Sequence, residues 1–179
     1  MSKADPNAPR LSLNCAVLTI SDSRTAETDT SGDYLAESIA AAGHRCIRRG
    51  ISSGNKYELR KIVSDWIADP DIQVIITNGG TGFTHQKATG EAITPLLDTT
   101  LAGFGELFRH LSYLEIGSSS LQSDAFGGVA NNTLVFCVPG STNACKTAWE
   151  RIIKEQLDST HRPCNFATHY ASLSDTLTL

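Results

Sequence analysis

The stretch VIITNGGTG, residues 74–82, determines the fold that we expect for this chain. Its first four residues are β-branched and uncharged, which favours a short buried strand. A glycine-rich loop follows at once. Because Gly79, Gly80 and Gly82 lack a Cβ, the backbone there can adopt positive φ and a ligand can approach successive N–H groups. Consecutive amides that point at one position bind anions, so we expect a ligand at this loop.

The same loop could also be a tight turn between a strand and a helix, with no ligand. It is not a Walker A motif, because no Gly-Lys-Ser/Thr follows, and it lacks the G-x-G-x-x-G fingerprint of dinucleotide-binding domains. The interpretation therefore depends on the rest of the chain.

Hydrophobic patterning before this stretch predicts alternating strands and helices. Residues 13–21 are a near-continuous apolar strand, and a second short strand is expected around Cys46 and Ile47. A helix is expected from the polar group at 29–32 to Ala42, and another over 57–68, where apolar residues recur on one helical face. This β-α-β-α-β order predicts parallel strands joined by helical crossovers.

The second half continues the pattern. Helices are expected over 91–97, 104–115 and 142–157, and a buried strand over 133–138. Residues 118–132 are interpreted as a loop or an edge hairpin. The predicted fold class is α/β, with a doubly wound, mostly parallel sheet in three α/β/α layers.

Length and composition predict one domain. The chain has 179 residues, of which 40% are hydrophobic, and a formal net charge of −4. That charge provides no basic surface for nucleic acid, and we expect no membrane span, no signal peptide and a cytoplasmic location. We expect a disordered start over 1–11, the domain over 12–170 and a flexible tail over 171–179. The five cysteines show no C-x-x-C spacing, which argues against zinc or disulfides.

Three apolar strands end in polar or glycine-rich loops, at 21–23, 78–82 and 139–141. In a parallel sheet these loops share the carboxyl edge, where ligands bind in open α/β folds. Individual residues allow other interpretations. Asp22 could cap a turn, and Asp29 could cap the following helix or hold Mg²⁺. We expect no metal or catalytic role for the isolated His85 and His110.

Several motifs together resemble the molybdopterin-binding MoaB/MogA family of molybdenum cofactor biosynthesis, and within it the MoaB branch. They are TISDSR at 19–24, DTSG at 29–32, NGGTGFT at 78–84, GFGELFRHLS at 103–112, VPGS at 138–141 and RPCNF at 162–166. The resemblance covers roughly residues 12–170 in the order of the family.

The resemblance implies a cytoplasmic trimer or hexamer that binds molybdopterin, with other molybdenum cofactor proteins as further partners. The terminal phosphate of the pterin would meet the amides at 79–82, and active relatives adenylylate it with MgATP. Asp29 would then help to hold Mg²⁺, while Glu106 and Arg109 would shape the pocket, unless these two form only a local ion pair. The other expected binding residues are Ser21, Asp22, Asn78, Thr81, Thr89, Ser112, Pro139, Gly140 and Ser141.

The chain departs from the family pattern at two acidic positions. Lys87 replaces an aspartate after the glycine loop, and residues 53–55 carry no carboxylate. Because Mg²⁺ prefers carboxylate ligands, a non-catalytic binding or carrier protein is the alternative to an adenylyltransferase. Lys87 could instead act in catalysis by replacing part of the metal's charge. A generic nucleotide-binding Rossmann domain is a more distant interpretation.

Overall fold

The computed structural model describes residues 3–82 and 88–175, and a six-stranded sheet in the order β3-β2-β4-β7-β6-β5 forms its centre. The strands are β2 (Asn14–Ile20), β3 (Arg45–Ser52), β4 (Val74–Asn78), β5 (Thr99–Thr100), β6 (Phe126–Ala130) and β7 (Thr133–Val138). Neighbours among β3, β2, β4 and β7 are parallel, whereas β6 and β5 are antiparallel to their neighbours. The predicted mostly parallel α/β sheet is confirmed.

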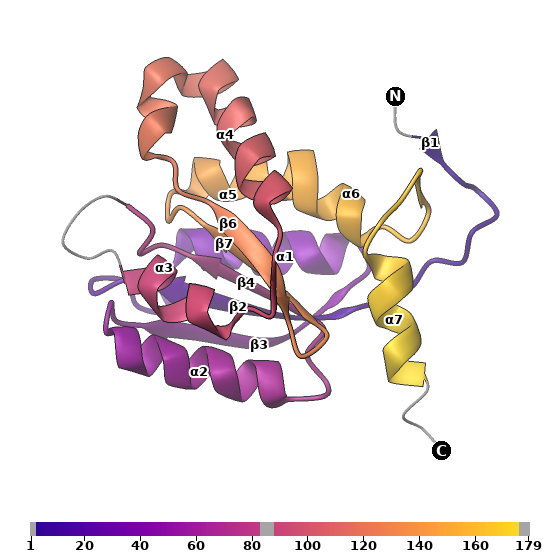
Figure 1. Cartoon of the computed structure of the whole chain (residues 1–179), viewed down its shortest axis with the longest axis horizontal. Helices are drawn as coiled ribbons and strands as arrows, with labels where there is room; N and C mark the ends of the chain where they lie inside the picture. The colour runs from indigo at the N-terminus through magenta and orange to yellow at the C-terminus, as the bar shows by residue number, and fades with distance from the viewer. Residues whose placement is uncertain (1–2, 83–87, 176–179) are drawn as a thin grey trace.

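Helices cover both faces of this sheet (Figure 1). On one face lie α2 (Lys56–Ala68) and α3 (Ala88–Ile93), which the turn η1 (Thr94–Leu96) extends. The other face carries α1 (Thr30–Ala41), α4 (Ala102–Ile116), α5 (Thr142–Ala148), the π-helical turn η3 (Trp149–Ile153) and α6 (Lys154–Leu157). After α4 the chain forms the turn η2 (Gly117–Gln122), and α7 (Ala167–Asp175) is the last described helix.

The strands bury side chains on both faces, which explains their near-continuous apolar sequences. Val17 and Ile76 point into the core formed with α1, α4 and α5, while Leu18 and Ile75 point into the core formed with α2 and α3. All four are at most 1% exposed. The alternation therefore produces three layers, as predicted.

The order of the strands reverses between β2 and β4. From β2 the chain crosses by α1 to β3 on one side, and then returns by α2 to β4 on the other side. At such a switch point the two neighbouring loops diverge to opposite faces and leave a crevice at the carboxyl edge of the sheet. The loops after β2 and β4 lie on either side of this crevice.

Several element boundaries differ from the sequence-based expectation. Helix α3 begins at Ala88 rather than at 91, and the short edge strand β5 was not predicted. The 118–132 region contains most of η2 and then β6, which forms a hairpin with β7. Asn131 and Asn132 have φ of 46° and 60°, and this left-handed pair makes the tight hairpin turn.

Near the ends of the chain, β1 (Lys3–Ala4) pairs with β8 (His161–Arg162). Lys3–Ala4 falls in the segment that was expected to be disordered. None of the helices in the described ranges is both long and apolar enough to cross a bilayer.

Candidate functional site

The glycine loop begins where β4 ends. Gly79 and Gly80 have φ of +96° and +63°, a conformation that residues with a Cβ rarely adopt. A Cβ at Gly79 would also collide with the carbonyl oxygen of Ile20, and one at Gly80 with Oγ1 of Thr89. Both glycines are therefore required by local sterics.

Hydrogen bonds fix this loop from two sides. The Gly79 N–H donates to the Val138 carbonyl over 3.0 Å, which ties the loop to the end of β7. Thr89, fully buried at the start of α3, donates its hydroxyl to the Gly79 carbonyl over 2.8 Å and its N–H to the Gly80 carbonyl over 3.2 Å. Thr89 thus supports the loop and does not line the cavity above it.

A buried polar network lies next to the loop. Asp29 caps α1, because one carboxylate oxygen accepts the Gly32 N–H over 3.0 Å. Its other oxygen accepts the Thr19 hydroxyl over 2.8 Å, and Thr19 in turn accepts from Asn78 Nδ2 over 2.9 Å. Arg49 Nη2 lies 3.5 Å from the same carboxylate oxygen, Oδ2. Gly32, Thr19 and Arg49 together engage both oxygens of the Asp29 side chain, which is 4% exposed.

This network bears on the two roles considered for Asp29. The capping role is present in the structure. Magnesium binding by Asp29 stays a prediction, and the ion would share the carboxylate with Gly32, Thr19 and Arg49. Over residues 3–82 and 88–175 no three His, Cys, Asp or Glu side chains cluster as a metal site would require.

A cavity of about 330 Å³ opens at the carboxyl ends of β2, β4 and β7. The three loops that were expected to share one edge all contribute to it. The predicted site residues that line it are Ser21, Asp29, Asn78, Gly79, Gly80, Thr81, Gly82, Pro139 and Gly140. Residues that line it without having been predicted are Thr19, Ile20, Arg24, Ser31 and Gln122.

A second hollow of about 270 Å³ shares the wall formed by Ser21 and Gly80. Asp22 lines this hollow rather than the main cavity, and its carboxylate accepts the Gly54 N–H over 3.0 Å. The contact joins the loop after β2 to the loop after β3. The crevice therefore has two adjacent compartments, one on each side of the Ser21 backbone.

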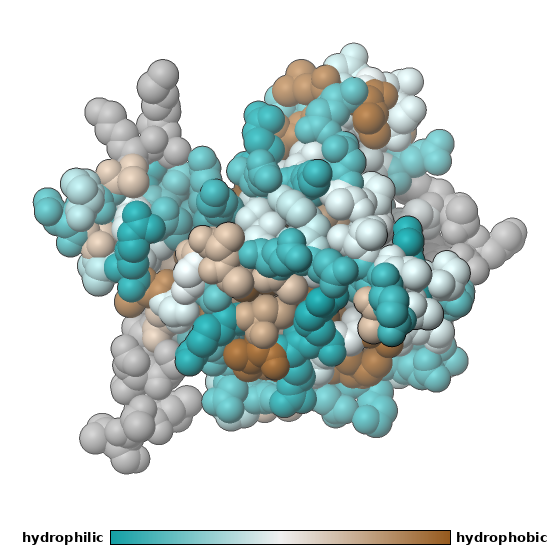
Figure 2. Space-filling view, turned by 180° about the vertical axis from the view of Figure 1, so that it is seen from behind, coloured by the Kyte–Doolittle hydropathy of each residue, from teal (hydrophilic) through white to brown (hydrophobic). Residues whose placement is uncertain are grey.

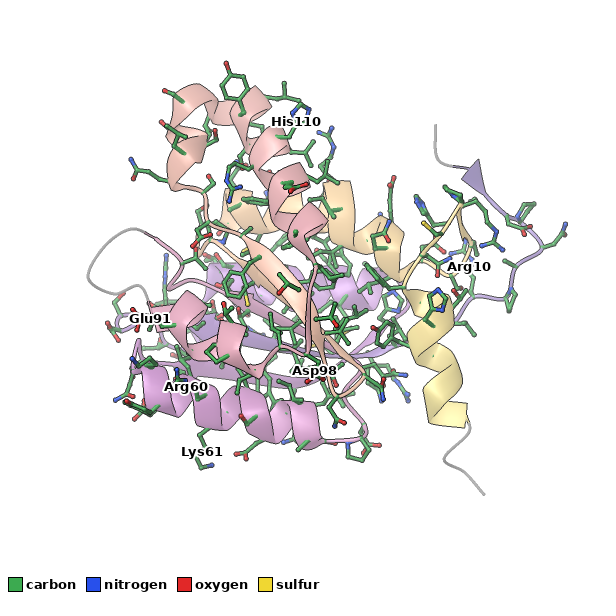
Figure 3. All side chains as sticks on the ribbon, viewed as in Figure 1. Arg10, Arg60, Lys61, Glu91, Asp98 and His110 are labelled. Carbon is green, nitrogen blue, oxygen red and sulfur yellow. The ribbon has the colours of Figure 1, made fainter. Side chains whose placement is uncertain are left out.

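Other predicted site residues lie elsewhere. Glu106 and Arg109 are exposed on α4, Ser112 is buried in the same helix, and none of the three lines the cavity. Ser141 caps α5 by accepting the Ala144 N–H over 3.2 Å. Lys87 lies outside the described residues, as does His85. His110 is exposed on α4 (Figure 3).

Some of the cavity residues that were not predicted belong to a sequence motif, and others do not. Arg24 ends the TISDSR motif, so attention to the whole motif could have found it. Ser31 belongs to the DTSG motif, and its hydroxyl donates to the Gly140 carbonyl over 3.0 Å. Gln122 has no local signal, because it reaches the cavity only through the path of α4 and η2.

Together, α4 and η2 form an arm that rises away from the rest of the domain at the top of Figure 1. Oxygens of Glu115 accept the Thr147 hydroxyl at 3.0 Å, which fastens the arm to α5. The arm carries apolar surface, visible as brown atoms in Figure 2. Its exposed large hydrophobic residues are Leu107, Tyr113, Leu114, Ile116 and Leu121.

The buried cysteines next to the site are held as thiols. Burial raises the pKa of both Cys137 and Cys145 to about 12, so each remains a thiol at neutral pH. All five cysteines are free.

Comparison with known proteins identifies relatives of the whole domain. Residues 16–159 match the family model described as a probable molybdopterin binding domain. The chain is 53% identical to molybdenum cofactor biosynthesis protein B of Escherichia coli K12 over 154 residues, which are 86% of this chain and 91% of that protein. It is 42% identical to the protein of the same name from Bacillus subtilis, over 81% of this chain and 86% of that protein.

Solved structures give the same relationship. A crystal structure of a molybdenum cofactor biosynthesis protein B superposes with a TM-score of 0.79 at 43% identity, over 82% of this chain and 91% of that one. The tungsten cofactor synthesizing protein MoaB from Pyrococcus furiosus superposes with a TM-score of 0.72 at 32% identity, over 80% of this chain and 92% of that one.

Proposed function

Because the chain belongs to the MoaB/MogA family of molybdenum cofactor biosynthesis, we propose that it binds molybdopterin in the cavity at the ends of β2, β4 and β7. The observation that carries this proposal is the glycine loop, in which two successive residues of positive φ border a polar cavity. Backbone amides in such a loop are suited to a phosphate. The terminal phosphate of the pterin would lie against residues 79–82.

The pterin ring would occupy the remainder of the cavity. Pro139 and Gly140 offer a flat backbone wall, and Ser31 and Gln122 offer polar groups for the ring edge. Ser21 and Asn78 would border the chain that links ring and phosphate. Ser112, Ser141, Glu106 and Arg109 would then act only indirectly, since none lines this cavity.

Two activities are compatible with molybdopterin binding. Adenylylation of the terminal phosphate by MgATP is supported by the second hollow, which shares Ser21 and Gly80 with the main cavity and offers space beside the phosphate position. Binding or carriage without AMP transfer is supported by the acidic groups. Both oxygens of Asp29 already have protein partners, and among the described residues no three His, Cys, Asp or Glu side chains gather near it.

We favour the second activity, because Lys87 stands where adenylylating relatives carry an aspartate, and residues 53–55 carry no carboxylate. The test is to incubate the protein with molybdopterin, ATP and Mg²⁺ and to measure both bound pterin and adenylylated product. Stoichiometric binding with no product above background is expected. Catalytic formation of product would instead establish an adenylyltransferase, and absence of pterin binding would contradict both activities.

We also propose that the protein forms a homo-oligomer, a trimer or hexamer, through the arm of α4 and η2. Support comes from its exposed apolar side chains, since large apolar patches on soluble proteins mark interaction surfaces. Contacts with other molybdenum cofactor proteins and a cytoplasmic location stay predictions from the sequence.

A further inference from the structure

We propose that Arg24 is a ligand-binding residue of this cavity and that its guanidinium pairs with the terminal phosphate of the bound pterin. The inference rests on the proposed binding of molybdopterin and assigns the positive charge that such binding needs. Three features of Arg24 support it: its position, its charge environment and its free donors.

The position of Arg24 is fixed at both ends of the residue. Its backbone N–H donates to Oγ of Ser21 over 3.2 Å, in a turn where the Ser23 N–H donates to the same oxygen over 3.3 Å. Its side-chain Nη1 donates to the Thr28 carbonyl over 2.8 Å. The guanidinium is therefore held at the cavity wall before any ligand arrives, which lowers the entropy cost of binding.

The charge balance of the cavity leaves Arg24 unneutralised. Among the described residues, Arg24 is the only lysine or arginine that lines the cavity, and no carboxylate lies within ion-pair distance of it. The one carboxylate among the described lining residues, that of Asp29, has Arg49 Nη2 at 3.5 Å, and the same nitrogen lies 2.8 Å from Asp33. Arg24 is therefore a cation without a carboxylate partner among the described residues at the wall of a polar cavity, which favours the binding of an anion there.

The donors of Arg24 match a phosphate. A guanidinium carries five N–H groups in a planar fork, and the bond to Thr28 uses only Nη1. The Nε and Nη2 edge remains for a bidentate contact with two phosphate oxygens. Residues 80–82 border the same cavity, and their amides are not taken by the bond that Gly79 donates to Val138, so these amides and Arg24 could contact one phosphate together. A lysine would retain the charge but lose the fork.

The experiment compares wild type, Arg24→Gln, Arg24→Lys and the control Arg45→Gln by isothermal titration calorimetry. Arg45 is an exposed arginine at the start of β3, on the amino edge of the sheet, so its substitution removes the same charge far from the cavity. The ligands are molybdopterin, inorganic pyrophosphate and 6-hydroxymethylpterin, a pterin without phosphate. We expect Arg24→Gln to bind molybdopterin at least about tenfold more weakly than wild type. The affinity of Arg24→Lys should lie between those of wild type and Arg24→Gln, and the control should bind as wild type does.

The pterin without phosphate separates a phosphate contact from a structural effect. Its affinity should be the same in wild type and Arg24→Gln, and equal losses for both pterins would overturn the proposal. If wild type fails to bind molybdopterin, the proposed function fails, and pyrophosphate then decides the role of Arg24. If Arg24→Gln loses pyrophosphate binding and Arg45→Gln keeps it, Arg24 remains an anion-binding residue of the cavity, although not for a pterin. Unchanged pyrophosphate binding in Arg24→Gln, or no binding to wild type, would reject that role as well.

Discussion

Thr19 donates its hydroxyl hydrogen to Oδ2 of Asp29 over 2.8 Å, and this bond joins the end of β2 to the cap of α1. The same hydroxyl oxygen accepts from Asn78 at the end of β4. Thr19, Asp29 and Asn78 are at most 3% exposed, so one buried hydroxyl connects two strands and a helix at the edge of the cavity. Removing it would leave two buried polar groups without this partner.

We predict that Thr19→Val lowers the free energy of unfolding by about 1–3 kcal/mol, because buried donors and acceptors are costly to leave unpaired. Valine has nearly the same shape, so packing changes little. Urea denaturation of the variant and of Thr100→Val, an exposed threonine in β5, gives the comparison. If the two variants unfold at the same urea concentration as wild type, the network does not stabilise the fold.

The glycine loop leads to a second prediction. Gly79→Ala places a Cβ against the carbonyl of Ile20 at a φ of +96°, so the loop must move and molybdopterin binding should fall more than tenfold. The matched control is Gly103→Ala on α4, where a Cβ meets nothing within 4 Å and which does not line the cavity. Fluorescence titration with molybdopterin measures both. Equal affinity of the two variants would show that the strained loop is not where the ligand binds.

Most of the sheet could be predicted because its evidence is local. A run such as that of β4 is apolar, short and followed by glycines, and those features need no tertiary context. The two-residue strand β5 could not be predicted. It is a strand only because Thr99 and Thr100 pair with Val129 and Gly128 of β6, a contact that nothing in the residues themselves specifies.

Some residues of the site could likewise be predicted from local sequence, whereas others depend on the tertiary structure. The glycine loop and Asn78 follow directly from the motif at the end of β4, whereas Gln122 reaches the cavity only through the length and direction of α4 and η2. Asp29 illustrates a different limit. Its capping and metal-binding roles require the same carboxylate next to a helix, and only the surrounding positions of Thr19 and Arg49 distinguish them.

His44 gives a prediction of pH dependence. Burial lowers the pKa of His44, although the nearby Asp158 opposes the shift, and its Nδ1 accepts the Leu13 N–H over 3.2 Å. The unfolded chain, in which histidine has its ordinary pKa of about 6.5, therefore binds the proton more readily. Neutral His44 therefore contributes to stability above about pH 6.5. This contribution is lost as the pH falls through the lower pKa that His44 has in the folded state.

The measurement is the free energy of unfolding of wild type and His44→Gln from pH 8 to pH 5. Groups common to both proteins cancel in the difference. We expect the advantage of wild type over the variant to shrink steadily as the pH falls below about 6.5. A difference that stays constant, or grows, on acidification would mean that His44 is not held neutral by its surroundings.

The arm of α4 and η2 carries the last prediction. Leu114 and Leu121 are 67% and 75% exposed, and η2 also contributes Gln122 to the cavity, so self-association through the arm would also order one wall of the ligand site. The double substitution Leu114→Lys and Leu121→Lys should therefore convert the oligomer to monomer and weaken molybdopterin binding together. Sedimentation velocity measures the first effect and calorimetry the second. Tyr57→Lys is the control, because Tyr57 is 70% exposed on α2, away from the arm. An oligomer that survives the leucine substitutions, or wild type that sediments as a monomer, would show that copies of the chain do not associate through this arm.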